Sequence, residues 1–90
     1  MRTVFIRITG KVQGVFYRAT ARDVAESLRL SGWVRNCADG AVEALASGAY
    51  DKIEEFIQWC HRGPEQAVVE RVVVTDSNEK AEDNSFRIRR

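Results

Sequence analysis

Two different spacings of apolar residues follow one another at the start of the chain. Over 4–8, one set of alternate residues is entirely aliphatic, which is the period of a strand with one buried face. From residue 19 onward, apolar residues recur three, four and seven positions apart, with charged residues between them. This second pattern predicts an amphipathic helix over 19–31, which Gly32 stops.

A hairpin and a second helix follow. The dipeptide Asp39-Gly40 separates two short apolar runs, and both of its residues tolerate positive φ. It therefore predicts a turn between two antiparallel strands. Helical spacing returns over 53–60, behind a group of acidic residues that favours a helix start. A Gly-Pro pair at 63–64 ends this helix.

The last third of the chain predicts one long strand and one short strand. The β-branched run 68–75 is typical of a strand, and its apolar alternation breaks at 70–71, which indicates a β-bulge. The polar, acidic segment 77–84 predicts a loop. Alternate apolar residues over 86–88 predict a final strand.

These elements give the order β-α-β-β-α-β with a short extra strand. Two strand–helix–strand units of similar length predict an α+β fold, a split β-α-β sandwich whose two helices cover one face of an antiparallel sheet. No linker or change of composition divides the 90 residues, so we expect a single domain over 1–90. This architecture serves enzymes, RNA binders and regulatory modules alike, so function has to be argued from particular residues.

Charge and composition exclude several classes of partner. Fourteen basic and thirteen acidic residues give a net charge of +1, so we expect no nucleic acid and no membrane held by bulk charge. No apolar stretch has the length of a membrane span, and the amino terminus lacks a secretory signal pattern, which favours a cytoplasmic protein. Two cysteines and one histidine cannot build a four-ligand zinc site unaided. We expect a monomer that needs no metal and no other cofactor.

The loop at 10–18, between the first strand and the first helix, carries the most chemical information. A helix start presents unpaired N–H groups and a dipole that favours an anion, and Gly10 and Gly14 let the backbone curve around one. Arg18 adds a planar, permanently charged fork suited to phosphate or carboxylate oxygens. A plain glycine turn with a solvated Arg18 stays open as the alternative interpretation of this spacing.

The common phosphate motifs do not account for this loop. It contains neither G-x-x-x-x-G-K-[ST] nor G-x-G-x-x-G. The sixth residues after Cys37 and Cys60 are Glu43 and Gln66, so neither cysteine begins a C-x5-R phosphatase loop. The commonest covalent route through a thiolate is therefore excluded.

Two longer segments resemble the signatures of the small acylphosphatase family. They are G-x-V-Q-G-V-x-Y-R over 10–18 and G-W-V-R-N-x3-G-x-V-x5-G over 32–48, in the family's order and with family-like separation. Tyr17 stands where the family often has phenylalanine. The resemblance covers the whole chain and implies the ferredoxin-like fold and the metal-independent hydrolysis of acyl phosphates.

The resemblance also implies a role for each matching residue. Arg18 would bind the phosphate of a small acyl phosphate, and Asn36 would orient the attacking water. Backbone amides would hold the same phosphate, namely those of Gln13, Gly14, Val15, Phe16, Tyr17 and Arg18. Free phosphate or sulfate should then compete with the substrate. As an alternative, Asn36 is a strand-end residue that only satisfies its own turn.

Two other functions share the predicted fold. An RNA-binding module needs aromatic residues on its central strands, and 41–47 carries none, which argues against that function. A non-catalytic anion sensor would keep the phosphate loop but would not require Asn36. The remaining reactive or aromatic residues are expected to have structural roles. We expect His61 to be a helix cap or a surface residue, and Cys37 and Cys60 to be free thiols rather than a disulfide. Packing is the expected role of Phe16, Tyr17 and Trp33.

Overall fold

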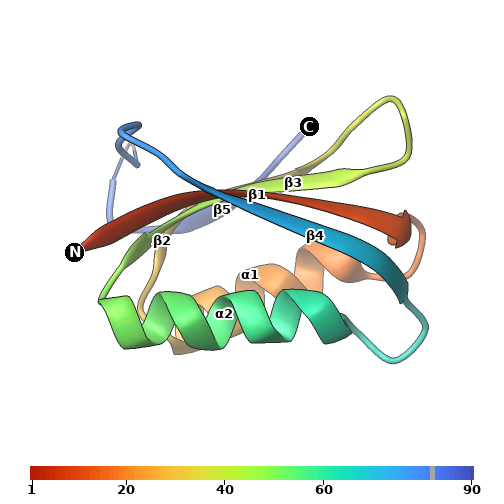
Figure 1. Cartoon of the computed structure of the whole chain (residues 1–90), viewed down its shortest axis with the longest axis horizontal. Coiled ribbons are helices and arrows are strands. Elements are labelled where there is room, and N and C mark those ends of the chain that lie inside the picture. Colours follow the sequence, from red (N-terminus) through yellow and green to blue (C-terminus); the bar gives the residue numbers. More distant parts are fainter. Residues whose placement is uncertain (82) are drawn as a thin grey trace.

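The computed structural model describes residues 1–81 and 83–90. Two helices lie side by side beneath a five-stranded sheet (Figure 1). The elements are, in chain order, β1 (Arg2–Lys11), α1 (Tyr17–Ser27), β2 (Ser31–Asn36), β3 (Val42–Gly48), α2 (Tyr50–Arg62), β4 (Val68–Asp76) and β5 (Phe86–Arg89). The predicted β-α-β-β-α-β order with an extra final strand is confirmed, and both helices cover the same face of the sheet.

The strand order in the sheet is β4-β1-β3-β2-β5. The first four strands pair antiparallel, as predicted, whereas β5 pairs parallel with β2 and makes the sheet mixed. The direction of β5 follows from the path of the chain. Strand β5 runs back after β4, so it points the same way as β2 when it joins the opposite edge.

The core lies between the sheet and the two helices. The alternate residues Val4, Ile6 and Ile8 of β1 are fully buried, and they pack with Ile53 and Phe56 of α2 in one hydrophobic cluster. The period-2 and period-3.6 patterns of the sequence therefore meet at this interface. Within residues 1–81 and 83–90, no helix has the length and apolar character needed to cross a membrane.

The predicted bounds of the first helix, 19–31, are wrong at both ends. The helix begins two residues earlier, at Tyr17, and stops at Ser27. Gly32 does not stop it but lies inside β2. A Cβ at Gly32 would come within 1.8 Å of the carbonyl oxygen of Leu45, so the glycine is needed for the close approach of β2 to β3.

Arg29 provides the helix stop that the sequence pattern assigned to glycine. Its φ of 57° is left-handed, the conformation typical of the residue after a helix C-cap. The N–H of Leu30 donates to the carbonyl of Ala25 (2.9 Å) and that of Arg29 donates to the carbonyl of Glu26 (3.0 Å). These two bonds form a Schellman motif built on a non-glycine residue, which composition alone does not reveal.

The other predicted breaks in the secondary structure are confirmed: the turn between β2 and β3, the bulge in β4 and the end of α2. The turn lies between β2 and β3, as predicted, and is closed by the Gly40 N–H, which donates to the Cys37 carbonyl (3.2 Å). Of the Asp39-Gly40 pair, Gly40 takes positive φ (94°) and Asp39 does not; the Asp39 carboxylate instead accepts a hydrogen bond from the N–H of Ala41. The register between β1 and β4 shifts next to Gly10 and leaves Glu70 as the extra residue of a bulge. Helix α2 ends directly before Gly63, as predicted.

Candidate active site

The loop between β1 and α1 curves because two of its residues are left-handed. Gly14 has φ 75° and Phe16 has φ 65°. A Cβ at Gly14 would meet nothing within 4 Å, so its backbone conformation, not a lack of space, is what favours glycine there. Phe16 holds the same conformation at a cost of roughly 1–2 kcal/mol for an ordinary residue. Backbone strain of this kind is concentrated at functional sites.

Helix α1 begins without any negative group of its own. Its N-cap residue, Phe16, makes no side-chain capping bond, and the first turn contains no acidic residue. The N–H groups of that turn are therefore left to solvent or to a ligand. Arg18, in the same turn, makes no hydrogen bond or ion pair with another side chain in the part of the chain described here. The helix start thus combines a positive dipole end with an uncompensated guanidinium.

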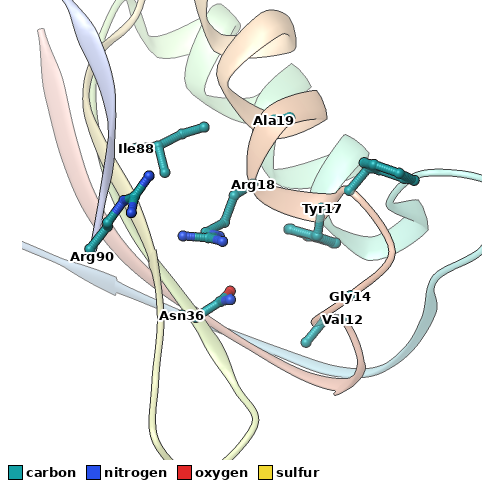
Figure 2. Close-up of a pocket in the computed structure, with 9 residues that line it drawn as sticks. Val12, Gly14, Tyr17, Arg18, Ala19, Asn36, Ile88 and Arg90 are labelled. Atoms are coloured by element: carbon teal, nitrogen blue, oxygen red, sulfur yellow. The ribbon is translucent and has the colours of Figure 1, made fainter.

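A pocket of about 550 Å³ lies at this helix start. It is lined by Val12, Gly14, Phe16, Tyr17, Arg18, Ala19, Asn36, Ile88 and Arg90. Figure 2 shows the guanidinium of Arg18 and the side-chain amide of Asn36 pointing into the same space, one from α1 and the other from the end of β2. The two residues that the sequence singled out for chemistry are therefore brought together from the start of the helix and the end of the second strand of the β-α-β unit.

Only some of the other predicted site residues line the pocket. Gly14, Phe16 and Tyr17 line the pocket with Arg18 and Asn36, whereas Gln13 and Val15 do not line it. Val15 is buried in the core with only 4% of its surface exposed. Its side chain anchors the loop, and only its backbone remains available for an anion.

Several lining residues were not predicted. Val12 lies at the start of the loop, Ala19 lies in the first turn of α1, and Ile88 and Arg90 come from the carboxyl end of the chain. The alternation in the last strand could have placed Ile88 on the helix-facing side, because Phe86 and Ile88 share one face. The missing information was the partner of that strand, since a four-residue strand carries no pairing signal of its own.

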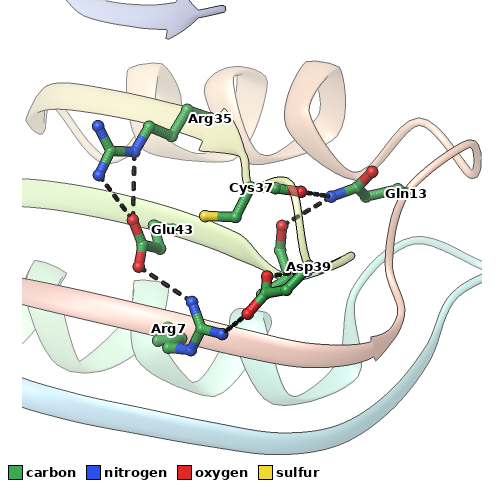
Figure 3. Close-up of polar contacts among 7 residues, drawn as sticks. Arg7, Gln13, Arg35, Cys37, Asp39 and Glu43 are labelled. Atoms are coloured by element: carbon green, nitrogen blue, oxygen red, sulfur yellow. Dashed lines mark hydrogen bonds and ion pairs between the residues drawn. The ribbon is translucent and has the colours of Figure 1, made fainter.

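Gln13 acts at a distance from the pocket through its side chain. Its Nε2 donates to the carbonyl oxygens of Cys37 and Ala41, both at 2.8 Å. These carbonyls lie in the turn between β2 and β3, so the bonds tie the loop after β1 to the hairpin that carries Asn36 (Figure 3). The resemblance to the acylphosphatases implied only a backbone role for Gln13.

Of the two neighbouring aromatic residues at the start of α1, Tyr17 is buried and Phe16 is exposed. The Tyr17 hydroxyl donates to the carbonyl of Cys60 in α2 (2.8 Å), and its ring packs against Trp59 with centroids 5.1 Å apart. Burial raises the pKa of Tyr17 far above its ordinary range, so it stays a neutral phenol. Packing therefore explains Tyr17 and the buried Trp33, but not Phe16, which is 76% exposed at the pocket.

The acidic residues of the nearby hairpin are neutralised by arginines other than Arg18. Both Arg7 (3.1 Å) and Arg35 (2.8 Å) pair with the carboxylate of Glu43, and Arg7 also pairs with Asp39 (Figure 3). The hydrogen bonds from Arg35 hold the pKa of Glu43 below its usual range. A backbone bond from Ala41, followed by Arg7, does the same for the pKa of Asp39. These carboxylates are thus paired within the hairpin and β1.

The remaining candidate residues lie outside the pocket. His61 is exposed in the last turn of α2, as expected for a cap or surface residue. Cys37 and Cys60 are both free thiols; burial raises the pKa of Cys60 to about 12 and also raises that of the half-buried Cys37. Among the described residues, no group of three or more histidine, cysteine, aspartate or glutamate side chains is arranged to hold a metal ion.

Comparison with known proteins identifies the family. The acylphosphatase family model matches residues 4–88. The chain belongs to the acylphosphatase family. It is 42% identical over 88 residues to an acylphosphatase of Rubrobacter xylanophilus, a match that covers 98% of this chain and 80% of that protein.

Solved structures of acylphosphatases agree with the fold. The acylphosphatase from Coxiella burnetii is 40% identical, with a TM-score of 0.89 over 98% of this chain and 92% of that one. The acylphosphatase from Bacillus subtilis is 32% identical, with a TM-score of 0.94 and full coverage of both chains. The expected ferredoxin-like α+β fold is confirmed. The chain is accordingly an enzyme of the acylphosphatase type, a hydrolase that acts on acyl phosphates.

Proposed function

We propose that the pocket at the start of α1 hydrolyses a small acyl phosphate by direct attack of water on phosphorus. The phosphate is held by Arg18 and by the backbone amides of 13–18, and the water is oriented by Asn36. The observation that carries this proposal is the convergence of Arg18 and Asn36 on one pocket at an uncapped helix start. An anion sensor would use the helix start and Arg18 but would have no need of the amide opposite them.

The phosphate-binding half of the site rests on charge and donor geometry. A guanidinium presents two parallel N–H donors that match two phosphate oxygens. The dipole and the free N–H groups of the first turn add a fixed positive potential. Phosphoryl transfer depends chiefly on positioning and on stabilising charge that is spread over the phosphate oxygens. These groups supply that stabilisation without moving during the reaction.

The water-activating half of the site requires little acid–base chemistry. The water oxygen attacks phosphorus, the bond to the acyl oxygen breaks, and the carboxylate leaves with the bonding electrons while the proton passes to a phosphate oxygen. The leaving carboxylate has a conjugate acid of pKa about 4, so it departs without a general acid. The Asn36 amide carries both a donor and an acceptor, and it adds no negative charge beside the phosphate. The chemistry of the leaving group is therefore the reason why we propose a metal-independent reaction.

The active unit that we propose is a cytoplasmic monomer. Arg18 and Asn36 reach the same pocket within one chain, so one protomer carries both groups that the proposed reaction needs. The two cysteines are free thiols, which suits a reducing compartment. Free phosphate and sulfate should occupy the same helix start and inhibit competitively.

The decisive experiment measures the hydrolysis of benzoyl phosphate in excess chelator, with an alkyl phosphate monoester as the matched poor substrate. We expect full activity on the acyl phosphate and little on the alkyl ester, whose alkoxide leaving group needs a general acid. Activity that disappears in chelator and returns with magnesium would contradict the metal-free mechanism. Comparable rates on both substrates would contradict the role assigned to the leaving group.

A further inference from the structure

The loop that forms the proposed phosphate site and the residue proposed to hold the water belong to separate parts of the sheet. The loop follows β1, and Asn36 ends β2, but these strands are not neighbours because β3 lies between them. The pairing of β1 with β3 ends at Ile8 and Val42, before the loop begins. The sheet alone therefore does not fix the distance between the two halves of the site.

A hydrogen-bonded link across this gap is made by the Gln13 side chain. Its amide nitrogen uses two N–H donors on two carbonyls, those of Cys37 and Ala41. Cys37 follows Asn36 directly, and Ala41 directly precedes Val42, the residue that pairs with Asn36. Gln13 thus binds both sides of the chain next to the last pair of the β2–β3 ladder (Figure 3).

The hairpin does not need Gln13 to satisfy these two carbonyls. The carbonyl of Ala41 also accepts the N–H of Cys37 (2.8 Å), and that of Cys37 also accepts the N–H of Gly40 (3.2 Å). Removal of the Gln13 amide would therefore leave neither acceptor buried without a donor. The contribution of the two bonds lies in where they hold the hairpin relative to the loop.

We infer that Gln13 is a positioning residue that sets the place of Asn36, and with it the attacking water, relative to the bound phosphate. This inference rests on the proposed function of the site. A misplacement of about 1 Å in a reacting group can lower a rate by roughly 10²-fold. Asn36 is positioned through the backbone that Gln13 binds, so loss of Gln13 should impair turnover through Asn36 rather than through the phosphate.

A double-mutant cycle tests this coupling. Gln13→Met keeps the length of the side chain and removes its donors. We expect kcat for benzoyl phosphate to fall on the order of 10-fold or more, while the inhibition constant of inorganic phosphate changes less than about threefold. In an Asn36→Ala background, the same substitution should lower kcat by less than about twofold, because the residue being positioned is already absent. Gln58→Met, on the exposed face of α2, is the matched control and should leave kcat unchanged.

Each other outcome overturns the inference. Losses that multiply in the double variant would mean that Gln13 acts independently of Asn36. A phosphate inhibition constant that weakens as much as kcat falls would place the defect in the phosphate loop. A fully active Gln13→Met protein would show that the bonds are dispensable.

A second measurement needs no activity and separates this inference from the proposed function. Hydrogen exchange of the Cys37 N–H, which is bonded to Ala41, should accelerate at least tenfold in Gln13→Met while that of α2 stays unchanged. Unchanged exchange would overturn the positioning role even in an active enzyme. A wild-type protein that does not hydrolyse acyl phosphates would overturn the proposed function, whereas the exchange result would still show whether Gln13 holds the hairpin.

Discussion

The two helices begin in opposite electrostatic ways. Neither has a side-chain cap. At the second residue, however, α2 carries Asp51 whereas α1 carries Arg18. The N-cap residues differ as well, since Ala49 before α2 is extended and Phe16 before α1 is left-handed. An acidic residue near a helix start stabilises the helix by about 0.3–1 kcal/mol, and a cation there has the opposite effect.

Only one of the two helix starts is electrostatically complete without a ligand. The first turn of α2 contains its own anion and lies away from the pocket. The first turn of α1 contains none, and it opens on a pocket that Asn36 also lines. We interpret the arginine, the strained N-cap and the missing acid of α1 together as an arrangement that becomes favourable when an external anion binds. Substitutions at five positions test this comparison.

The largest effect is expected at Arg18. Arg18→Ala should lower kcat/KM for an acyl phosphate on the order of 10³-fold or more, because the main charge on the phosphate is lost. Arg18→Lys should not rescue it, since an ammonium lacks the two-point fork. Neither variant should be less stable than wild type in urea unfolding, because a cation near the helix start is removed or only exchanged. Arg71→Ala, exposed on β4, is the control; a severe loss of stability at Arg18 would contradict the comparison.

Asn36 should affect the rate more selectively. Asn36→Ala is expected to lower kcat on the order of 10²-fold, the scale of a lost positioning group, while the phosphate inhibition constant stays nearly the same. Steady-state kinetics with phosphate as inhibitor measure both quantities. A folded variant with full activity, or one that loses phosphate binding as severely as Arg18→Lys, would refute the division of roles.

An acidic residue added to the first turn of α1 should make the electrostatics of this helix start resemble those of α2. Ala19→Glu places a carboxylate in the first turn, beside Arg18, where it competes with phosphate for the same positive potential. We expect the phosphate inhibition constant to weaken roughly tenfold, the ratio that corresponds to about 1.4 kcal/mol. Lys52→Glu also places a carboxylate at the third residue of its helix, where it removes the ion pair with Glu55, and it should leave inhibition unchanged. Equal effects of both substitutions would mean that the start of α1 has no special affinity for anions.

The contribution of the contact between α1 and α2 to the free energy of unfolding can be measured. Tyr17→Phe removes the hydroxyl that donates to Cys60 and leaves that carbonyl without this donor. Urea unfolding should show a loss of about 1 kcal/mol, the usual contribution of a buried hydrogen bond. No loss would mean that water replaces the hydroxyl at the junction of the two helices.

The smallest effect is expected at Asp51. Asp51→Asn should lower the free energy of unfolding by about 0.3–1 kcal/mol, and the loss should shrink in high salt because the interaction with the helix dipole is screened. Acyl phosphate hydrolysis should be unchanged. A change in kcat would contradict the separation between a stabilising helix start and a functional one.

The sequence predicts local periodicity and turn chemistry well. The alternation in β1, the helical spacing of α2 and the Asp39-Gly40 turn are each determined within a few residues, and all three are confirmed. The end of α1 was not predictable in this way. Its stop is a left-handed Arg29, which carries none of glycine's compositional signal.

Contacts between residues far apart in the sequence were the other feature that could not be predicted. The motif comparison indicated Arg18 and Asn36, and the structure brings them to one pocket. The bonds from Gln13 to the hairpin join residues at least 24 positions apart, and no local pattern encodes them. The same holds for Ile88, which reaches the pocket only because β5 pairs with β2.

The strand order has a kinetic consequence. Strand β1 lies between β3 and β4, and its residue Val4 pairs with Asp76, so the first strand made is completed by the last long one. Closing such distant pairs slows folding relative to a helical bundle of the same size. Because Gln13 ties the loop after β1 to the β2–β3 hairpin, we expect this loop to reach its final shape late in folding. An anion bound there should therefore prolong the lifetime of the native state by slowing unfolding, with little effect on the rate of folding.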